Sequence, residues 1–273
     1  MRRYYRYIED TIVCVAVDEW ILEHAYEKII SVLNSFTNVF ERSAKSRNLY
    51  CFYIVQEKDR ESFLTEDKFV VEDFDDDRWL LELINDLEDF YAKIFMCTVL
   101  HGSCMRLHNN NILLLGERWT GKTTLTYYLT TYCDGQYMAD DCVYILNGKY
   151  CGFCTPLPIR NFQLEANKEL QIIATTFDSD NVMRTMLCPP KTISSVDHID
   201  IVVFPHFSIK GNNRVTNIAP SCAFQEIIKN VHSLNNMKRV YKDILKLASQ
   251  THTYIIEYQS SAWAYHMIQD CIK

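Results

Sequence analysis

The chain has 273 residues, of which 48% are hydrophobic, 13% aromatic and 23% charged, as in globular proteins rather than disordered or fibrous ones. Its 28 Lys and Arg residues against 35 Asp and Glu residues give a net charge of −7, which disfavours nucleic-acid binding. No apolar run approaches the roughly 20 residues of a membrane-spanning helix, and the N-terminal residues do not resemble a secretion signal. We therefore expect a cytoplasmic protein that binds neither nucleic acid nor membrane.

The first 97 residues predict alternating strands and helices. The basic, aromatic run 2–7 is interpreted as an edge strand, with a partner-binding arm as the alternative. Strands are expected at 11–17, 49–55 and 68–71, with a helix near 22–33. A second helix is expected after Asp73–Asp77, because carboxylates favour a helix N-terminus and an apolar stripe follows. Residues 1–97 are predicted to form an N-terminal α/β region packed on a domain of residues 98–273.

The second region predicts more strands and helices in mixed order. Runs 99–107 and 111–116 predict an antiparallel hairpin, followed by a helix at 122–132 and one strand at 136–146. A turn at Asn147-Gly148 and a strand at 149–153 come next. Later elements are a strand at 200–205, helices at 223–234 and 238–249, a strand at 253–258 and a last helix from Ser260. The fold class is therefore α/β, a mixed β-sheet with flanking helices.

One motif points to nucleotide chemistry. It matches the pattern GxxxxGK(S/T) between a predicted strand and a predicted helix, where backbone N–H groups and the helix N-terminus bind phosphate. Lys122 is expected to contact the β- and γ-phosphates of ATP, and the Thr123 hydroxyl to bind Mg²⁺. The candidate nucleotide-binding residues are Gly116, Glu117, Arg118, Trp119, Thr120, Gly121, Lys122, Thr123 and Thr124.

Two adjacent carboxylates follow in the strand predicted at 136–146. Because neighbours on a strand face opposite sides, we expect one to face the nucleotide and its metal and the other the acceptor hydroxyl or a structural partner. Thr123 and Asp140 are the candidate Mg²⁺ ligands, although the choice of metal ligand and general base between Asp140 and Asp141 stays open. If the hairpin turn centres between Asn109 and Asn110, His101 lies opposite Arg118. There it is either a structural histidine or one that orients a catalytic carboxylate.

A proline-stiffened segment, Thr155–Arg160, is expected to leave the sheet near the phosphate-binding edge. Arg160 would then line the acceptor groove or neutralise charge on the transferring phosphate. The alternative is a surface loop in which Arg160 pairs with an acid such as Glu165.

These residues together resemble the HPr kinase/phosphorylase family, over about residues 98–160: Leu100–Ser103, the hairpin, the run from Gly116 to Leu125, and Met138–Asp141. The resemblance implies a P-loop kinase core similar to that of phosphoenolpyruvate carboxykinase. It also implies Lys122 for phosphates, Thr123 for Mg²⁺, one Asp of the pair as general base and His101 supporting it. Trp119 departs from the family's usual inner glycine. The family's Glu-x-Arg-Gly sequence is absent, which argues against its carrier-protein substrate and its phosphorylase reaction.

The expected function is an ATP-dependent kinase that needs Mg²⁺ and phosphorylates a hydroxyl, most simply a serine of a peptide or small protein. A peptide-tailoring kinase of a biosynthetic cluster is one such enzyme. A small-molecule kinase and a non-catalytic nucleotide-binding module are the alternatives, and a homo-oligomer is left open. The candidate catalytic residues are Asp140, Asp141, His101, Lys122 and Arg160.

Overall fold

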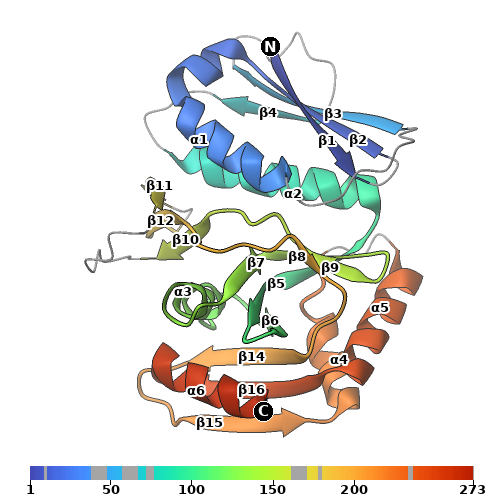
Figure 1. Cartoon of the computed structure of the whole chain (residues 1–273), viewed down its shortest axis with the longest axis vertical. Coiled ribbons are helices and arrows are strands. Elements are labelled where there is room, and N and C mark those ends of the chain that lie inside the picture. Colours follow the sequence, from blue (N-terminus) through green and yellow to red (C-terminus); the bar gives the residue numbers. More distant parts are fainter. Residues whose placement is uncertain are drawn as a thin grey trace.

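The computed structural model describes residues 1–8, 11–37, 48–56, 67–71, 77–160, 171–177, 180–232 and 236–272. These residues form three β-sheets with helices between and around them (Figure 1). The fold class is α/β with mixed sheets, as the sequence predicts. In the part of the chain that the structure describes, no helix is both long and apolar enough to cross a membrane.

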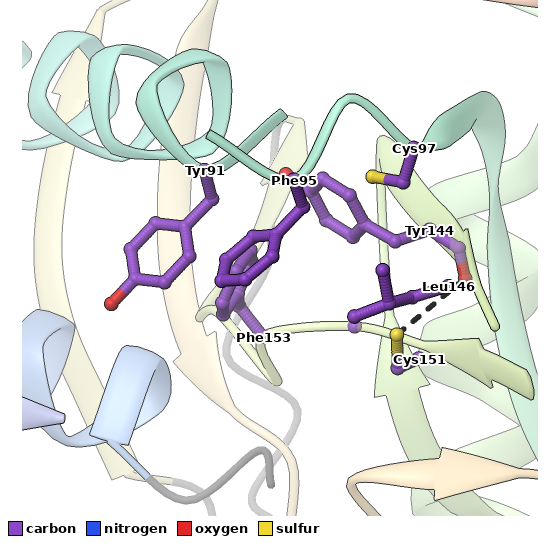
Figure 2. Close-up of a pocket in the computed structure, with 8 residues that line it drawn as sticks. Tyr91, Phe95, Cys97, Tyr144, Leu146, Cys151 and Phe153 are labelled. Atoms are coloured by element: carbon purple, nitrogen blue, oxygen red, sulfur yellow. Dashed lines mark hydrogen bonds between the residues drawn. The ribbon is translucent and has the colours of Figure 1, made fainter. Parts of the chain in front are cut away.

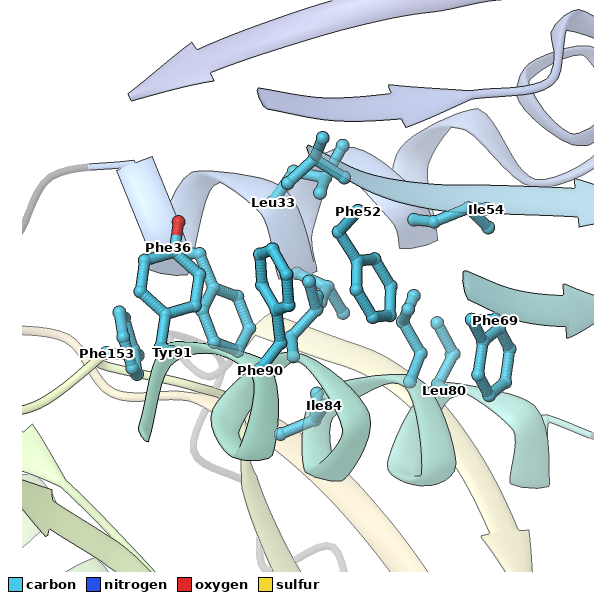
Figure 3. Packing of buried hydrophobic residues seen from close by; sticks show 14 of the residues in the cluster. Leu33, Phe36, Phe52, Ile54, Phe69, Leu80, Ile84, Phe90, Tyr91 and Phe153 are labelled. Carbon is cyan, nitrogen blue, oxygen red and sulfur yellow. The ribbon is translucent and has the colours of Figure 1, made fainter. Parts of the chain in front are cut away.

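The N-terminal sheet has four strands in the order β1-β2-β3-β4: β1 (Arg2–Ile8), β2 (Thr11–Val17), β3 (Asn48–Gln56) and β4 (Lys68–Val71). β1 pairs antiparallel with β2 at the edge, which confirms the edge strand. Two helices, α1 (Glu19–Thr37) and α2 (Arg78–Phe95), lie between this sheet and the rest of the molecule (Figure 1). Their apolar side chains pack against Phe52, Ile54 and Phe69 of the sheet (Figure 3).

The start of α2 differs in detail from the expectation. Asp77 precedes the helix but makes no capping hydrogen bond. Its carboxylate instead accepts from Lys28 Nζ of α1 at 2.5 Å, so it ties the two helices together. The rest of the acidic run, Asp73–Asp76, lies outside the described residues.

The central sheet has nine strands, eight of them in the order β13-β9-β8-β5-β6-β14-β16-β15, with β7 paired to β5. Parallel pairing of β6, β14 and β16 puts their C-terminal ends at one edge. In open α/β sheets this is the edge where ligands bind. The bounds are β5 (Thr98–Leu107), β6 (Asn110–Leu115), β7 (Gln136–Ala139), β8 (Cys142–Leu146), β9 (Lys149–Cys151), β13 (Ser195–Val196), β14 (Ile201–Phe207), β15 (Arg214–Ile218) and β16 (His252–Tyr258).

Helices cover both faces of the central sheet. On one face, α3 (Lys122–Tyr132) and α6 (Ser261–Cys271) pack against Val203 and its same-face neighbours. On the other, α4 (Pro220–Ile228) and α5 (Met237–Gln250) pack against Val202. The helix predicted near 223–234 ends earlier, at Ile228. The chain beyond it is not helical, because Val231 forms a β-bridge with Leu100 of β5.

A third, smaller sheet has the order β10-β12-β11, from β10 (Leu157–Arg160), β12 (Met183–Cys188) and β11 (Gln171–Phe177). No element is predicted for residues 161–199, so β11, β12 and β13 are new. β10 contacts α3, which places this sheet beside the helix that follows the loop of residues 116–121.

The N-terminal helices and the central sheet share one hydrophobic cluster. Tyr91 of α2 meets Phe153 edge-on, with ring centroids 4.6 Å apart, and Tyr144 of β8 meets the same ring at 5.0 Å. Beside these rings is an apolar gap of about 10 Å³, bordered also by Phe95 and Cys151 (Figure 2). It has no room for a ligand. The boundary between residues 1–97 and 98–273 stays a prediction.

The hairpin of β5 and β6 has a shorter turn than predicted. Gly102 pairs with Leu115, and Leu107 with Asn110, so the turn consists of His108 and Asn109 alone. Both have positive φ, 48° and 68°, as a two-residue type I′ turn requires. Continuing this register brings His101 to the level of residue 116, so the predicted pairing with Arg118 is wrong.

Candidate active site

The glycine-rich loop, residues 116–121, joins the C-terminal end of β6 to the N-terminus of α3. The ends of the neighbouring strands hold it: the Phe207 N–H donates to the Thr120 carbonyl at 3.0 Å, and the Tyr258 hydroxyl to that of Gly121 at 3.2 Å. Gly121 has φ 97°, and a Cβ there would lie 2.4 Å from the Tyr258 hydroxyl oxygen. The loop therefore requires glycine at this position.

Lys122, the first residue of α3, turns its side chain into the loop and is 5% exposed. Its Nζ donates to the carbonyls of Gly116 at 2.6 Å and Glu117 at 3.0 Å. Burial lowers the pKa of the amine, and the carboxylates of Asp141 and Asp140 oppose that shift. A buried cation thus stands at the positive end of the α3 dipole, where an anion would be stabilised.

His101 of β5 is brought to this lysine. Its Nε2 lies 3.3 Å from Lys122 Nζ. Since an ammonium group can only donate, the imidazole accepts through an unprotonated Nε2 and is neutral. Burial, followed by the charge of Lys122, lowers the pKa of His101. Among the described residues no hydrogen bond joins His101 to either Asp of the pair, so its direct partner is the amine.

The Asp pair does not lie within one strand, and the predicted strand 136–146 is wrong at this point. β7 and β8 both pair with β5, through Ala139 with Cys104 and Cys142 with His101, and the two acids form the link between them. The Cys142 N–H donates to the Asp140 carbonyl at 2.9 Å. Asp141, with φ 65°, is therefore the centre of a γ-turn.

The two acids differ in their surroundings. Asp140 is 3% exposed, and its Oδ1 accepts a hydrogen bond from the Ser103 hydroxyl. Burial, reinforced by the charge of Asp141, raises the pKa of Asp140 to about 7, while the hydroxyls of Ser103 and Thr123 act in the opposite sense. Asp141 is only half-buried.

The surroundings of Asp140 fit a magnesium ion. Its Oδ2 is buried and has no hydrogen-bond partner among the described residues, which is costly unless a cation or donor satisfies it. The Thr123 hydroxyl acts on the same carboxylate. Mg²⁺ typically takes one or two carboxylates plus phosphate and water oxygens. In the described chain no group of three or more His, Cys, Asp or Glu residues could hold a metal alone.

Arg160 reaches the loop from β10. Its guanidinium carbon lies 3.4 Å from the centre of the Trp119 ring, and its charge helps to lower the pKa of Lys122. Glu165, the alternative partner of Arg160, lies outside the described residues. The remaining predicted loop residues Glu117, Arg118 and Thr124 are exposed.

Two polar residues at the site were not predicted as functional. Ser103 holds Asp140, and Glu88 of α2 is fully buried beside the pair, in hydrogen-bond contact with the Cys142 thiol. Burial, reinforced by Asp141 and Asp140, holds the pKa of Glu88 well above its usual range. The sequence signal for Glu88 is its spacing: it lies four residues after Ile84, on the apolar face of the helix.

A groove larger than the gap of Figure 2 lies elsewhere. A groove of about 630 Å³ lies at the opposite edge of the central sheet, where β14 and β16 begin, lined by residues such as Asp200, Lys246 and His252. Neither this groove nor the gap of Figure 2 borders the loop 116–121. The candidate site is therefore defined by its side-chain geometry.

Comparisons with known proteins add little. No protein-family model matches the sequence, and no curated protein matches it. Among solved structures, the chain is similar to the HPr(Ser) kinase/phosphatase from Coxiella burnetii with a TM-score of 0.28 and 8% sequence identity, covering 63% of this chain and 92% of that one. A likeness this weak supports no conclusion about function. The assignments that follow rest on the geometry of the site and on the sequence resemblance of residues 98–160.

Proposed function

We propose that this protein is a Mg²⁺-dependent kinase that transfers the γ-phosphoryl group of ATP to a hydroxyl, with a serine of a peptide or small protein as acceptor. One observation carries the proposal: the buried amine of Lys122 lies inside a loop at a helix N-terminus, close to two carboxylates of different exposure. The peptide acceptor is carried over from the resemblance of residues 98–160 to the HPr kinase/phosphorylase family.

In this proposal the loop and α3 bind the phosphates. Lys122 Nζ exchanges its contacts with the loop carbonyls for oxygens of the β- and γ-phosphates. Mg²⁺, held by Asp140 Oδ2 and the Thr123 hydroxyl, would neutralise charge on the same phosphates. His101 keeps the amine in place by accepting from it. Thr123, Lys122 and the N–H groups of the loop thus form the nucleotide site.

Asp141 is the general base in this proposal, because it is less enclosed than Asp140. Its carboxylate takes the proton of the acceptor hydroxyl while that oxygen bonds to the γ-phosphorus. The bond from the γ-phosphorus to the bridging oxygen breaks, and ADP leaves with the electron pair. Lys122 and Arg160 offset the negative charge on the transferring group.

The test separates nucleotide binding from transfer. Thermal unfolding of wild type with and without MgATP reports binding without any acceptor. Incubation with labelled ATP and two acceptor panels, serine peptides and small hydroxyl compounds, then identifies the phosphorylated product by mass spectrometry. Asp141→Asn is the matched control, since it changes one atom of the carboxylate.

Each outcome decides something. We expect MgATP to raise the midpoint of unfolding, and a serine peptide to gain a phosphate that Asp141→Asn fails to transfer. Phosphate found only on small compounds makes the protein a small-molecule kinase. Binding without transfer to any acceptor favours a nucleotide-binding module, and absence of MgATP binding overturns the proposal.

A further inference from the structure

Trp119 occupies an unusual position in the glycine-rich loop. Its φ is 71°, in the left-handed region that bulky residues rarely adopt. Its side chain is 61% exposed, so burial in the core does not explain why a large aromatic residue is there. A stabilising contact at this position therefore has to come from another part of the chain.

That contact is Arg160. The guanidinium carbon is 3.4 Å from the ring centre, the distance of direct face-to-face stacking. An arginine that stacks on an aromatic ring uses the face of its guanidinium group, whereas its N–H donors point outward in the plane of the group. Stacking on Trp119 and binding a phosphate through the edge are thus compatible.

Arg160 lies close to two other cationic side chains, which is why the Trp119 ring matters as its support. Arg160 pairs directly with Arg184 of β12, and like charges opposite each other disfavour the pair. The same arginine is close enough to Lys122 to affect its pKa. The face of an aromatic ring can hold a guanidinium group by a cation–π contact without adding a charge of its own.

We propose that Trp119 is a positioning residue: its indole ring holds the guanidinium group of Arg160 over the loop, where it meets the transferring phosphoryl group. This inference rests on the proposed kinase function and adds to it the residue that places the second cation.

The test is a double-mutant cycle with Trp119→Leu, Arg160→Ala and the double variant. We expect each single variant to lower kcat by about tenfold or more with little change in MgATP affinity. The double variant is expected to be no slower than Arg160→Ala, because Trp119 acts only through that arginine. Trp119→Tyr should recover most of the activity, since it keeps an aromatic face.

Trp119→Gly separates positioning from backbone strain. Glycine adopts a φ of 71° easily, so this variant should fold, with its midpoint of unfolding as the check, and still be as slow as Trp119→Leu. Wild-type activity of Trp119→Gly would overturn the inference, as would multiplicative losses in the double variant. A weakened MgATP affinity with unchanged kcat would also overturn it, because the indole would then contact the nucleotide.

A failure of the proposed function is distinguishable from a failure of this inference. If wild type transfers no phosphate, the kinase proposal falls and the positioning role falls with it. If transfer is observed, the double-mutant cycle alone decides whether Trp119 positions Arg160. Urea unfolding of wild type, Trp119→Leu, Arg160→Ala and the double variant measures the stacking contact itself. A coupling free energy of zero between positions 119 and 160 contradicts the contact, and a stabilising coupling free energy supports it.

Discussion

Asp140→Asn is predicted to stabilise the metal-free protein, and to do so more strongly as the pH rises. The buried carboxyl of Asp140 has a pKa of about 7 in the folded protein, against an ordinary value of 3.8. In the pH range between these values the folded chain keeps a proton that the unfolded chain releases. Wild type therefore loses stability as the pH rises from about 4 to about 7, and no further above that.

The size of the effect follows from the two pKa values. At about 1.4 kcal/mol per pH unit, ionisation of Asp140 costs the folded state on the order of 4 kcal/mol above pH 7. Between pH 5 and pH 8 the loss is on the order of 2 to 3 kcal/mol. Asparagine cannot ionise, and its amide oxygen can still accept from Ser103. The variant should therefore escape this loss.

The assay is urea unfolding of both proteins between pH 5 and pH 8, with a chelator present. The difference in unfolding free energy, variant minus wild type, should grow by about 2 to 3 kcal/mol over that range. A difference that stays constant with pH would refute the reasoning about burial. With MgATP added, the order should reverse, because only wild type offers a carboxylate to the metal. A stability gain coupled to a functional loss is typical of active-site residues.

Three further changes test separate parts of the site. Lys122→Ala should lose most of the stabilisation that MgATP gives wild type, about 2.7 kcal/mol at a hundred times Kd; equal stabilisation of both proteins would show that the loop is not the nucleotide site. Asp141→Asn should lower kcat by at least about tenfold with nucleotide affinity nearly unchanged, and a mild effect on turnover would remove it as the base. Gly121→Ala should destabilise the fold by about 1 to 3 kcal/mol, because its Cβ would lie 2.4 Å from the Tyr258 hydroxyl. Tyr258→Phe should relieve part of that loss. Thermal unfolding of Gly121→Ala with Tyr258 and with Phe at position 258 measures the difference.

The sequence predicts those elements that are bounded by characteristic motif, cap or turn residues. α3 begins and ends where the motif and Asp134-Gly135 place it, at Lys122 and Tyr132. The turn at Asn147-Gly148 has φ values of 50° and 83°, as its composition predicts. β11 and β12 escaped because many of their residues are half-buried or exposed, so no apolar alternation marks them. Their partners are also set by tertiary packing rather than by neighbouring residues.

The sequence indicates which residues lie in the candidate site, but it indicates less well which side chains contact one another there. Lys122 and Arg160 reach the loop as expected, since a helix N-terminus and a stiff strand fix their directions. The residues alone leave the role of His101 open, and the resemblance implies support of a carboxylate, yet its hydrogen bond is to Lys122. Glu88 comes from α2, far away in sequence, and only packing of the N-terminal helices on β8 brings it to Cys142. A sequence shows that a polar residue will be buried, but not which partner will satisfy it.

Two residues of the candidate site have a backbone conformation that the sequence does not predict. Asp141 breaks a strand at φ 65°, and Trp119 has φ 71° in the loop of residues 116–121. Positive φ values are not confined to these two residues. Those at His108, Asn109 and Asn147 belong to hairpin turns whose residues tolerate them, and Met96, Asp134, Cys154 and Asn181 have positive φ as well. A left-handed conformation costs a bulky residue such as tryptophan about 1 to 2 kcal/mol, and glycine at position 119 would avoid that cost. Strained backbone is found often at active sites. The proposed function gives both side chains a role near Lys122: Asp141 as the general base and Trp119 as the residue that places Arg160.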